Sequence, residues 1–228
     1  MYQYVKTMCP WGLDGKEITI EIDSNRSLPT IDIIGLPDSA IKESKERLRA
    51  AFRRCEIDIP ARKFVINLAP SDVRKSGTLY DVAIATALLC CIYNEKRHHI
   101  QECQETLWFG ELGLDGSVRK VQGLLPAVLA GIKRGYRRFV IPSENARELS
   151  YVTGVDIYPI AHFADIVGYV VGGKELTLTT SREAVVFSQT LGRESSTSLS
   201  TLDAIRGHAV AKRIVAIGVC GFHNMLMV

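Results

Sequence analysis

Apolar and polar residues alternate along several short stretches of this chain, as they do in β-strands that are buried on one face. Ile18 to Ile22 shows this alternation clearly, and Thr30 to Leu36 is a second stretch rich in β-branched residues. Phe64 to Leu68 predicts a third strand, which ends at the following Ala-Pro pair. Two further strands are expected over residues 138–141 and 155–159.

Residues 107–113 and 118–121 predict a β-hairpin that turns at Asp115-Gly116, a dipeptide suited to tight turns. The three glycines of this segment do not have the G-x-G-x-x-G spacing of a dinucleotide-binding loop. We therefore assign them to turns.

Helical periodicity occupies the segments between the strands. Asp38 is a good N-cap for an amphipathic helix that runs to about Cys55. Residues 81–93 are apolar almost all round, which predicts a buried central helix. Four shorter helices are also expected. They cover residues 124–134, the residues that follow a cap at Ser143, residues 163–171 and residues 209–220.

The order of these elements predicts a fold and three parts of the chain. Strands and helices mix through residues 1–172, which indicates an α/β or α+β domain with a mixed sheet. Residues 173–201 are rich in Ser and Thr and are interpreted as a linker. Residues 202–228 are ordered again, with a strand expected to start at Asn224.

Composition adds few constraints. The net charge of +3 is too small to indicate a partner. No apolar run reaches the ~20 residues of a membrane-spanning helix, and the start of the chain is unlike a secretory signal. A cytoplasmic protein that binds no membrane is therefore expected. The six cysteines never form C-x-x-C, so we expect reduced, buried side chains. His98-His99 has no third ligand at a suitable spacing, and no metal site is predicted.

Three stretches of the chain together resemble the ComM/YifB family of magnesium-chelatase-like AAA+ ATPases. They are IGLPDSAIKES at 34–44 with residues 60–70 after it, KSGTLYD at 75–81, and GELGLDG at 110–116 with its continuation to 146. The last two stretches also resemble the Lon protease domain. The resemblance implies a fold like domain 2 of ribosomal protein S5 over residues 1–172.

The likeness to Lon implies a Ser-Lys dyad, in which a lysine of lowered pKa deprotonates the nucleophilic serine. In the aligned motifs Leu79 stands at the serine position and Leu125 at the lysine position. A leucine can neither attack a carbonyl nor accept a proton. We therefore predict a catalytically silent domain in which both leucines pack as core residues.

Two other interpretations remain open. A residual peptidase would use Ser76 or Ser117 with Lys75 or Lys120, although nothing in the spacing pairs a serine with a lysine. A magnesium-chelatase-like ATPase subunit is the other alternative, and only the inherited family name supports it.

The end of the chain resembles the opening of the family's AAA+ module, with matches at 203–208, 211–213 and 223–228. The resemblance implies that His223 and Asn224 lie near a nucleotide site and that G-x-x-x-x-G-K-[ST] follows Val228. No cofactor is therefore expected for these residues alone. ATP and Mg²⁺ are expected for the complete family member. That protein is expected to form a hexameric ring and to drive DNA branch migration in recombination and natural transformation.

Basic residues form two clusters that are candidates for contact with DNA phosphates. One cluster lies on the helix that follows Asp38, and the other begins at the end of the helix predicted over 124–134. The candidates are Lys42, Lys45, Arg49, Arg53, Lys133 and Arg134. Acidic residues interleave with the first cluster, as on an ordinary solvated face. Aromatic residues are sparse near both clusters in the sequence, which argues against a platform for single strands.

Overall fold

The structure is a computed structural model that describes residues 2–12, 14–93, 99–178, 205–221 and 225. The chain divides into two compact units, Met1–Val185 and Val186–Val228. Most of the predicted linker over 173–201 lies outside the described residues, as do His223 and Asn224. The predicted boundaries at 172 and 201 stay predictions.

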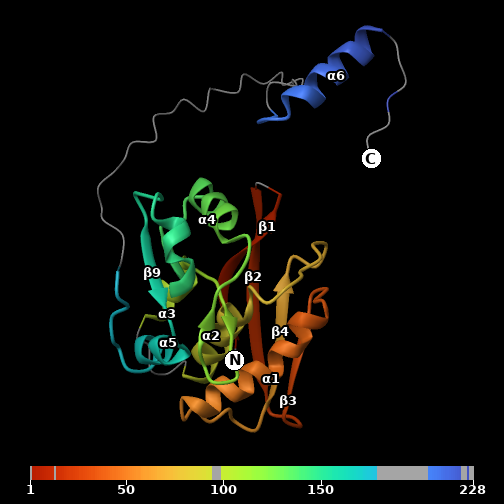
Figure 1. Cartoon of the computed structure of the whole chain (residues 1–228). Coiled ribbons are helices and arrows are strands. Elements are labelled where there is room, and N and C mark those ends of the chain that lie inside the picture. Colours follow the sequence, from red (N-terminus) through yellow and green to blue (C-terminus); the bar gives the residue numbers. More distant parts are fainter. Residues whose placement is uncertain (1, 13, 94–98, 179–204, 222–224, 226–228) are drawn as a thin grey trace. The chain divides into compact units, whose positions relative to one another are not determined.

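The described part of the first unit contains a seven-stranded sheet in the order β3-β4-β2-β1-β5-β8-β9. The β1–β2 and β2–β4 pairs are antiparallel, whereas the four other neighbouring pairs are parallel. The predicted mixed sheet is therefore confirmed. Figure 1 shows the long β1–β2 pair, with β4 and β3 beyond β2. The strands are β1 (Tyr2–Trp11), β2 (Asp14–Asn25), β3 (Thr30–Ile34), β4 (Lys63–Ala69), β5 (Thr106–Trp108), β8 (Arg138–Pro142) and β9 (Asp156–Ile160).

The predicted hairpin is smaller than expected. Its strands are β6 (Glu111–Leu112) and β7 (Val118–Arg119), joined through the expected turn at Asp115-Gly116. Leu107 belongs instead to β5, which pairs with β1 and β8 in the large sheet. Gly110 lies between β5 and β6, where the chain leaves the large sheet. Its φ of 146° is accessible to glycine but costly for other residues.

The helices of the first unit follow the sequence closely, with two exceptions. The side chain of Asp38 accepts a hydrogen bond of 2.9 Å from the backbone N–H of Ile41, which confirms the predicted N-cap. The helix expected after Ser143 is a 3₁₀-helix, and Ser143 lies inside it while Pro142 occupies the capping position. A short helix beginning at Ile100 had not been predicted. The helices are α1 (Ser39–Arg54), α2 (Asp81–Ile92), α3 (Ile100–Glu105), α4 (Leu124–Lys133), η1 (Ser143–Leu149) and α5 (Phe163–Val170).

The second unit contains α6 (Ala209–Cys220), which confirms the helix predicted over these residues. The strand expected to start at Asn224 falls largely outside the described residues.

One face of the sheet forms the main core. Ile18, Ile20 and Ile22 of β2 are completely buried, and α2, which is buried along almost its whole length, packs against β1 and β2. The helices α1 and α5 pack against α2, and the rings of Phe52 and Phe163 lie 4.9 Å apart. The predicted central helix is therefore confirmed, and it organises this layer.

The opposite face of the sheet is covered in part by α4. Small residues bring the helix close: a methyl group on Gly15 of β2 would lie 2.9 Å from Cβ of Ala130, and one on Gly131 would touch Leu107 and Phe139. Beyond α4 this face is open. Tyr4, on the same face as Lys6, is half-buried where it pairs with Glu21 across the strands.

We expect Gly131→Ala to lower the free energy of unfolding by about 1 to 2 kcal/mol, because the new methyl group would lie 2.6 Å from Leu107 and 2.9 Å from Phe139. Gly168→Ala in α5 is the matched control, since its methyl group meets only the flexible side chain of Lys174 at 3.3 Å. The control should be neutral or stabilising. Urea titration measures both changes, and equal stability of the two variants would contradict this packing of α4.

Candidate functional site

The two leucines at the Lon dyad positions have different surroundings. Leu79 lies just before α2, is 6% exposed, and accepts a hydrogen bond of 3.1 Å at its backbone oxygen from Gly110. Leu125 is 36% exposed, although Leu124 beside it is completely buried. Consecutive helical residues point in directions about 100° apart, and in the first turn of α4 the side chain of Leu124 faces the core while that of Leu125 is partly exposed to solvent. The prediction of core packing is confirmed for Leu79 and wrong for Leu125.

The serines considered for a residual peptidase are not held beside a lysine. Ser117 donates its hydroxyl to Asp115 at 2.6 Å inside the hairpin, and Ser76 lies exposed in its loop. Lys75 is completely buried, and its ammonium donates to the backbone oxygens of Gly35, at 3.0 Å, and Pro70. Burial lowers the pKa of Lys75. Within the described residues, no hydrogen bond joins this lysine to a serine hydroxyl. Its observed role is to tie two loops together.

A buried carboxylate joins three elements at this end of the domain. Asp81 of α2 accepts two hydrogen bonds from the guanidinium of Arg47, at 2.6 and 3.0 Å, and one of 3.2 Å from the backbone N–H of Leu112 in β6. Burial raises the pKa of Asp81 to about 6, although Arg47 and Leu112 favour the charged form. We call this group the Asp81 joint. It fixes α1 and the hairpin against α2. It also engages Arg47 of α1 in an ion pair inside the domain.

The loops around the Asp81 joint carry the motifs that resemble Lon. The hydroxyl of Thr78 donates to the carboxylate of Glu111, which links the loop before α2 to the hairpin. Asp38 caps α1 and also accepts a hydrogen bond of 2.9 Å from the backbone N–H of Gly77. These polar side chains therefore hold the loops in place, and they include no nucleophile paired with a base.

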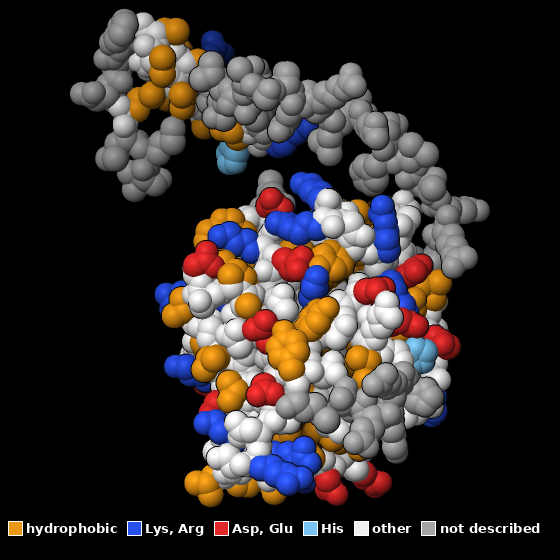
Figure 2. Space-filling model, turned by 180° about the vertical axis from the view of Figure 1, so that it is seen from behind, with side chains coloured by type: hydrophobic (Ala, Val, Ile, Leu, Met, Phe, Trp, Pro, Cys, Tyr) orange, Lys and Arg blue, Asp and Glu red, His pale blue; other side chains and the backbone are white. Residues whose placement is uncertain are grey.

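The candidate DNA contacts form two separate groups. The α1 group is mostly exposed on the layer that covers the main core, whereas Lys133 and Arg134 are exposed at the end of α4 on the opposite face. Arg49 forms an ion pair of 3.0 Å with Glu46, and Arg134 lies 3.8 Å from Asp14. Figure 2 shows cationic and anionic side chains interspersed on the side that it draws. The structure thus does not bring the six candidates into one basic patch.

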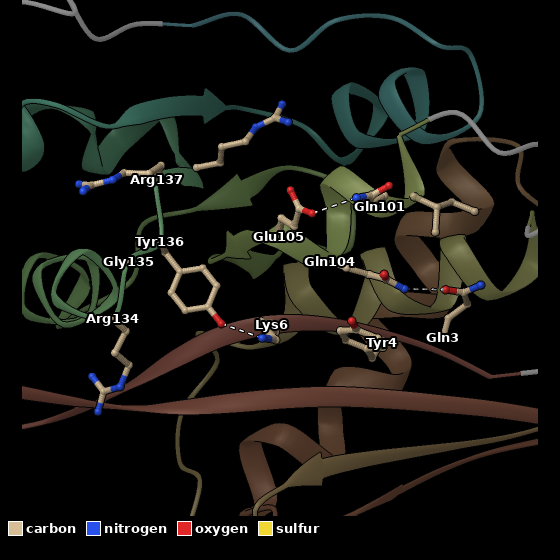
Figure 3. A pocket seen from close by; sticks show the side chains of 12 residues that line it. Gln3, Tyr4, Lys6, Gln101, Gln104, Glu105, Arg134, Gly135, Tyr136 and Arg137 are labelled. Atoms are coloured by element: carbon tan, nitrogen blue, oxygen red, sulfur yellow. Dashed lines mark hydrogen bonds between the residues drawn. The ribbon is translucent and has the colours of Figure 1, made fainter.

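A polar pocket of about 1020 Å³ lies beside the second basic group. It is formed by β1, α3 and the turn between α4 and β8 (Figure 3). Tyr4 and Tyr136 both line it, so the prediction that aromatic residues are sparse here is wrong. Sequence reasoning missed the pocket because β1 and α3 had not been predicted. Its residues are Gln3, Tyr4, Lys6, Ile100, Gln101, Gln104, Glu105 and 134–138.

A cluster of charges supports the rim of this pocket. Arg138 donates to Glu102 of α3 at 2.6 Å, and the hydroxyl of Tyr169 in α5 donates to the same oxygen at 2.7 Å. The ring of His99 stacks on Tyr169 with ring centroids 4.3 Å apart. The hydrogen bond from Tyr169, together with Arg138, lowers the pKa of Glu102 to about 2. This cluster joins α3 to β8 and α5.

The described residues contain no group of three or more His, Cys, Asp and Glu side chains placed to hold a metal ion. No helix in the part of the chain that the structure describes is long and apolar enough to cross a membrane. Cys9, Cys90, Cys91 and Cys103 are buried as predicted, whereas Cys55 is half-buried and Cys220 is exposed.

The fold and these motifs agree with comparisons to known proteins. The family model described as subunit ChlI of Mg-chelatase matches residues 20–145, more than half of the chain, and includes α1, α2 and the hairpin. The chain therefore belongs to the ChlI family of magnesium-chelatase-like proteins.

Individual relatives confirm the more specific resemblance to ComM and YifB. Competence protein ComM of Haemophilus influenzae is 30% identical over 215 residues, which are 94% of this chain and 41% of that protein. YifB of Escherichia coli is 30% identical over 224 residues, 98% of this chain and 42% of that protein. A Lon protease of Desulfovibrio desulfuricans is 24% identical over 172 residues, 70% of this chain and 19% of that protein. The chain thus spans about two-fifths of the length of the ComM and YifB relatives.

We expect Asp81→Ala to lower the free energy of unfolding by about 3 kcal/mol, because it leaves the largely buried guanidinium of Arg47 without its partner. Glu46→Ala removes the surface partner of Arg49 and should change stability by no more than about 0.5 kcal/mol. Urea titration of both variants measures the difference. Equal effects would contradict a structural role for the Asp81 joint.

We also expect the stabilisation by Glu102 to depend on pH. Because its pKa is lower in the folded state, about 2 against the ordinary 4.5, its contribution is present above pH ~4.5 and is lost as the pH falls toward 2. Glu102→Gln should therefore destabilise the chain at pH 7, and the difference from the unmodified chain should shrink below pH ~4. Urea titration across this range measures it. A difference that is independent of pH would contradict the assignment.

Proposed function

We propose that this chain is a non-catalytic accessory and assembly domain of an ATP-dependent, DNA-processing AAA+ protein. The observation that carries the proposal is the pair of leucines at the Lon dyad positions, within loops that the Asp81 joint still holds in place. A framework kept without its reacting groups is suited to positioning other parts of a protein, since catalysis requires a placed nucleophile and base.

The wider role rests on the family. ComM of Haemophilus influenzae is named a competence protein, which supports a role for the complete protein in natural transformation. We infer that the complete protein forms a hexameric ring, binds ATP and Mg²⁺ in its AAA+ module, and drives DNA branch migration. His223 and Asn224 would lie near the nucleotide in that module, and this assignment rests on sequence resemblance alone.

Contact between this domain and DNA is part of the proposal. The exposed α1 cations (Lys42, Arg49 and Arg53), together with the half-buried Lys45, would bind phosphates without sequence preference. Lys133 and Arg134 would do so on the other face. Such binding weakens as salt concentration rises, because each neutralised phosphate releases counterions.

We expect the 228-residue chain to cleave neither casein nor fluorescent peptides above the rate of a buffer blank, because no serine that the structure describes is paired with a lysine base. Fluorescence release over several hours measures this, with an active Lon protease as the positive control. The variants Ser76→Ala and Ser117→Ala are assayed in parallel. Cleavage by the unmodified chain that disappears in either variant would overturn the proposal in favour of a residual peptidase.

A further inference from the structure

The pocket between β1, α3 and the α4–β8 turn is independent of the loops that resemble Lon. Leu125 lies in the first turn of α4, whereas the pocket begins at Arg134, just after the last residue of the same helix. A helix of ten residues separates its ends by about 15 Å. The function proposed for the Lon-like framework therefore does not account for this pocket.

A fixed aromatic ring forms one wall of the pocket. The hydroxyl of Tyr136 accepts a hydrogen bond of 2.8 Å from the ammonium of Lys6 and donates one of 2.8 Å to Glu17. The ammonium of Lys6 also lies 3.3 Å from the carboxylate of Glu17, which closes the triangle. The half-buried ring is therefore held in place before any ligand arrives, and little conformational entropy would be lost on stacking.

The facing wall of the pocket offers hydrogen-bond donors and acceptors together. Gln101 donates to Glu105 at 3.2 Å along α3, and Gln104 donates to Gln3 of β1 at 3.3 Å. Figure 3 shows Tyr136, Lys6 and Glu105 arranged around one space. Amide and carboxylate groups of this kind match the mixed donor and acceptor edges of nucleobases.

Cations occupy the outer rim. Arg134 and Arg137 are exposed, and Figure 3 shows both extending outward from the turn. Arg137 makes no ion pair with any residue that the structure describes. Arg134 lies 3.8 Å from Asp14 and donates a hydrogen bond of 3.3 Å to the backbone oxygen of Ala130, and both contacts are long. Both guanidinium groups can therefore donate hydrogen bonds to phosphates without breaking a strong existing ion pair.

We propose that this pocket binds one nucleotide of single-stranded nucleic acid, with the base stacked on Tyr136 and the flanking phosphates at Arg134 and Arg137. The inference rests on the proposed DNA-processing role and names the form of DNA that this domain contacts. A base in a duplex is already paired and stacked between its neighbours, so only an unpaired base can stack on Tyr136, which selects single strands over duplex. A volume of about 1020 Å³ is large enough for one nucleotide.

The test is fluorescence anisotropy of the 228-residue chain with a labelled oligonucleotide of about 16 nucleotides, single-stranded or as a duplex. Tyr136→Leu should weaken single-strand binding about tenfold, whereas Tyr136→Phe keeps the ring and should retain most of the affinity. Arg137→Ala should reduce the slope of log affinity against log salt by about 1. Circular dichroism confirms that each variant is folded.

The matched control is Arg62→Ala, an exposed arginine outside both α1 and the pocket, which should leave single-strand affinity within about twofold. Loss of binding in Lys42→Ala and Arg49→Ala but not in the Tyr136 and Arg137 variants would overturn the pocket assignment while leaving DNA contact by α1 intact. Equal losses in Tyr136→Leu and Tyr136→Phe would remove the stacking role. A deoxynucleoside monophosphate that binds as tightly as the oligonucleotide would show a free-nucleotide site and overturn the strand proposal. None of these outcomes depends on the peptidase assay, which tests the accessory role separately.

Discussion

The arrangement of this domain depends on one buried ion pair, between Arg47 of α1 and Asp81 at the start of α2. A buried carboxylate is costly unless its hydrogen bonds are satisfied, and Asp81 meets this requirement with two of the three nitrogens of one guanidinium, Nε and Nη2, and the backbone N–H of Leu112. Each partner comes from a different element. The pair therefore specifies how α1, α2 and the hairpin meet, as well as neutralising a charge.

The Asp81 joint holds the Lon-like loops in place although the serine and lysine of a catalytic dyad are absent from the aligned positions. The loops that resemble Lon keep the Asp115-Gly116 turn and the hydrogen bond between Thr78 and Glu111, while leucine stands at both dyad positions. The proposed DNA contacts lie elsewhere, on the exposed face of α1 and beyond the far end of α4. A domain of this kind can position other parts of a protein and contact a charged polymer without catalysing a reaction.

Much of the fold could be predicted because local signals were strong. The Asp38 cap, the apolar run of α2 and the Asp115-Gly116 turn each act over a few residues. β1 could not be predicted, since its burial depends on pairing with both β2 and β5, and the three consecutive buried residues 7–9 obscure the alternation. α3 has only six residues, which are too few for a helical periodicity to be recognised in the sequence.

The candidate site was harder to predict than the fold. The leucines at the dyad positions were visible in the sequence, but the exposure of Leu125 depends on how α4 is rotated. Tyr136 stands between the arginines of the second basic cluster, yet its partner Lys6 is 130 residues away in sequence. The pocket is assembled from three separate segments, and no single-sequence pattern reports such a contact.

The central claim is that this domain contributes a scaffold and no catalysis. The most direct measurement is ATP-driven branch migration by the complete protein in which Ser76, Ser117 and Lys120 are replaced together by Ala, Ala and Met. These side chains lie in or beside the Lon-like loops, and the buried Lys75 is left in place. The account predicts a rate within about twofold of the unmodified protein, since none of them forms a nucleophile–base pair. Loss of branch migration in a variant that still folds and still hydrolyses ATP would contradict it.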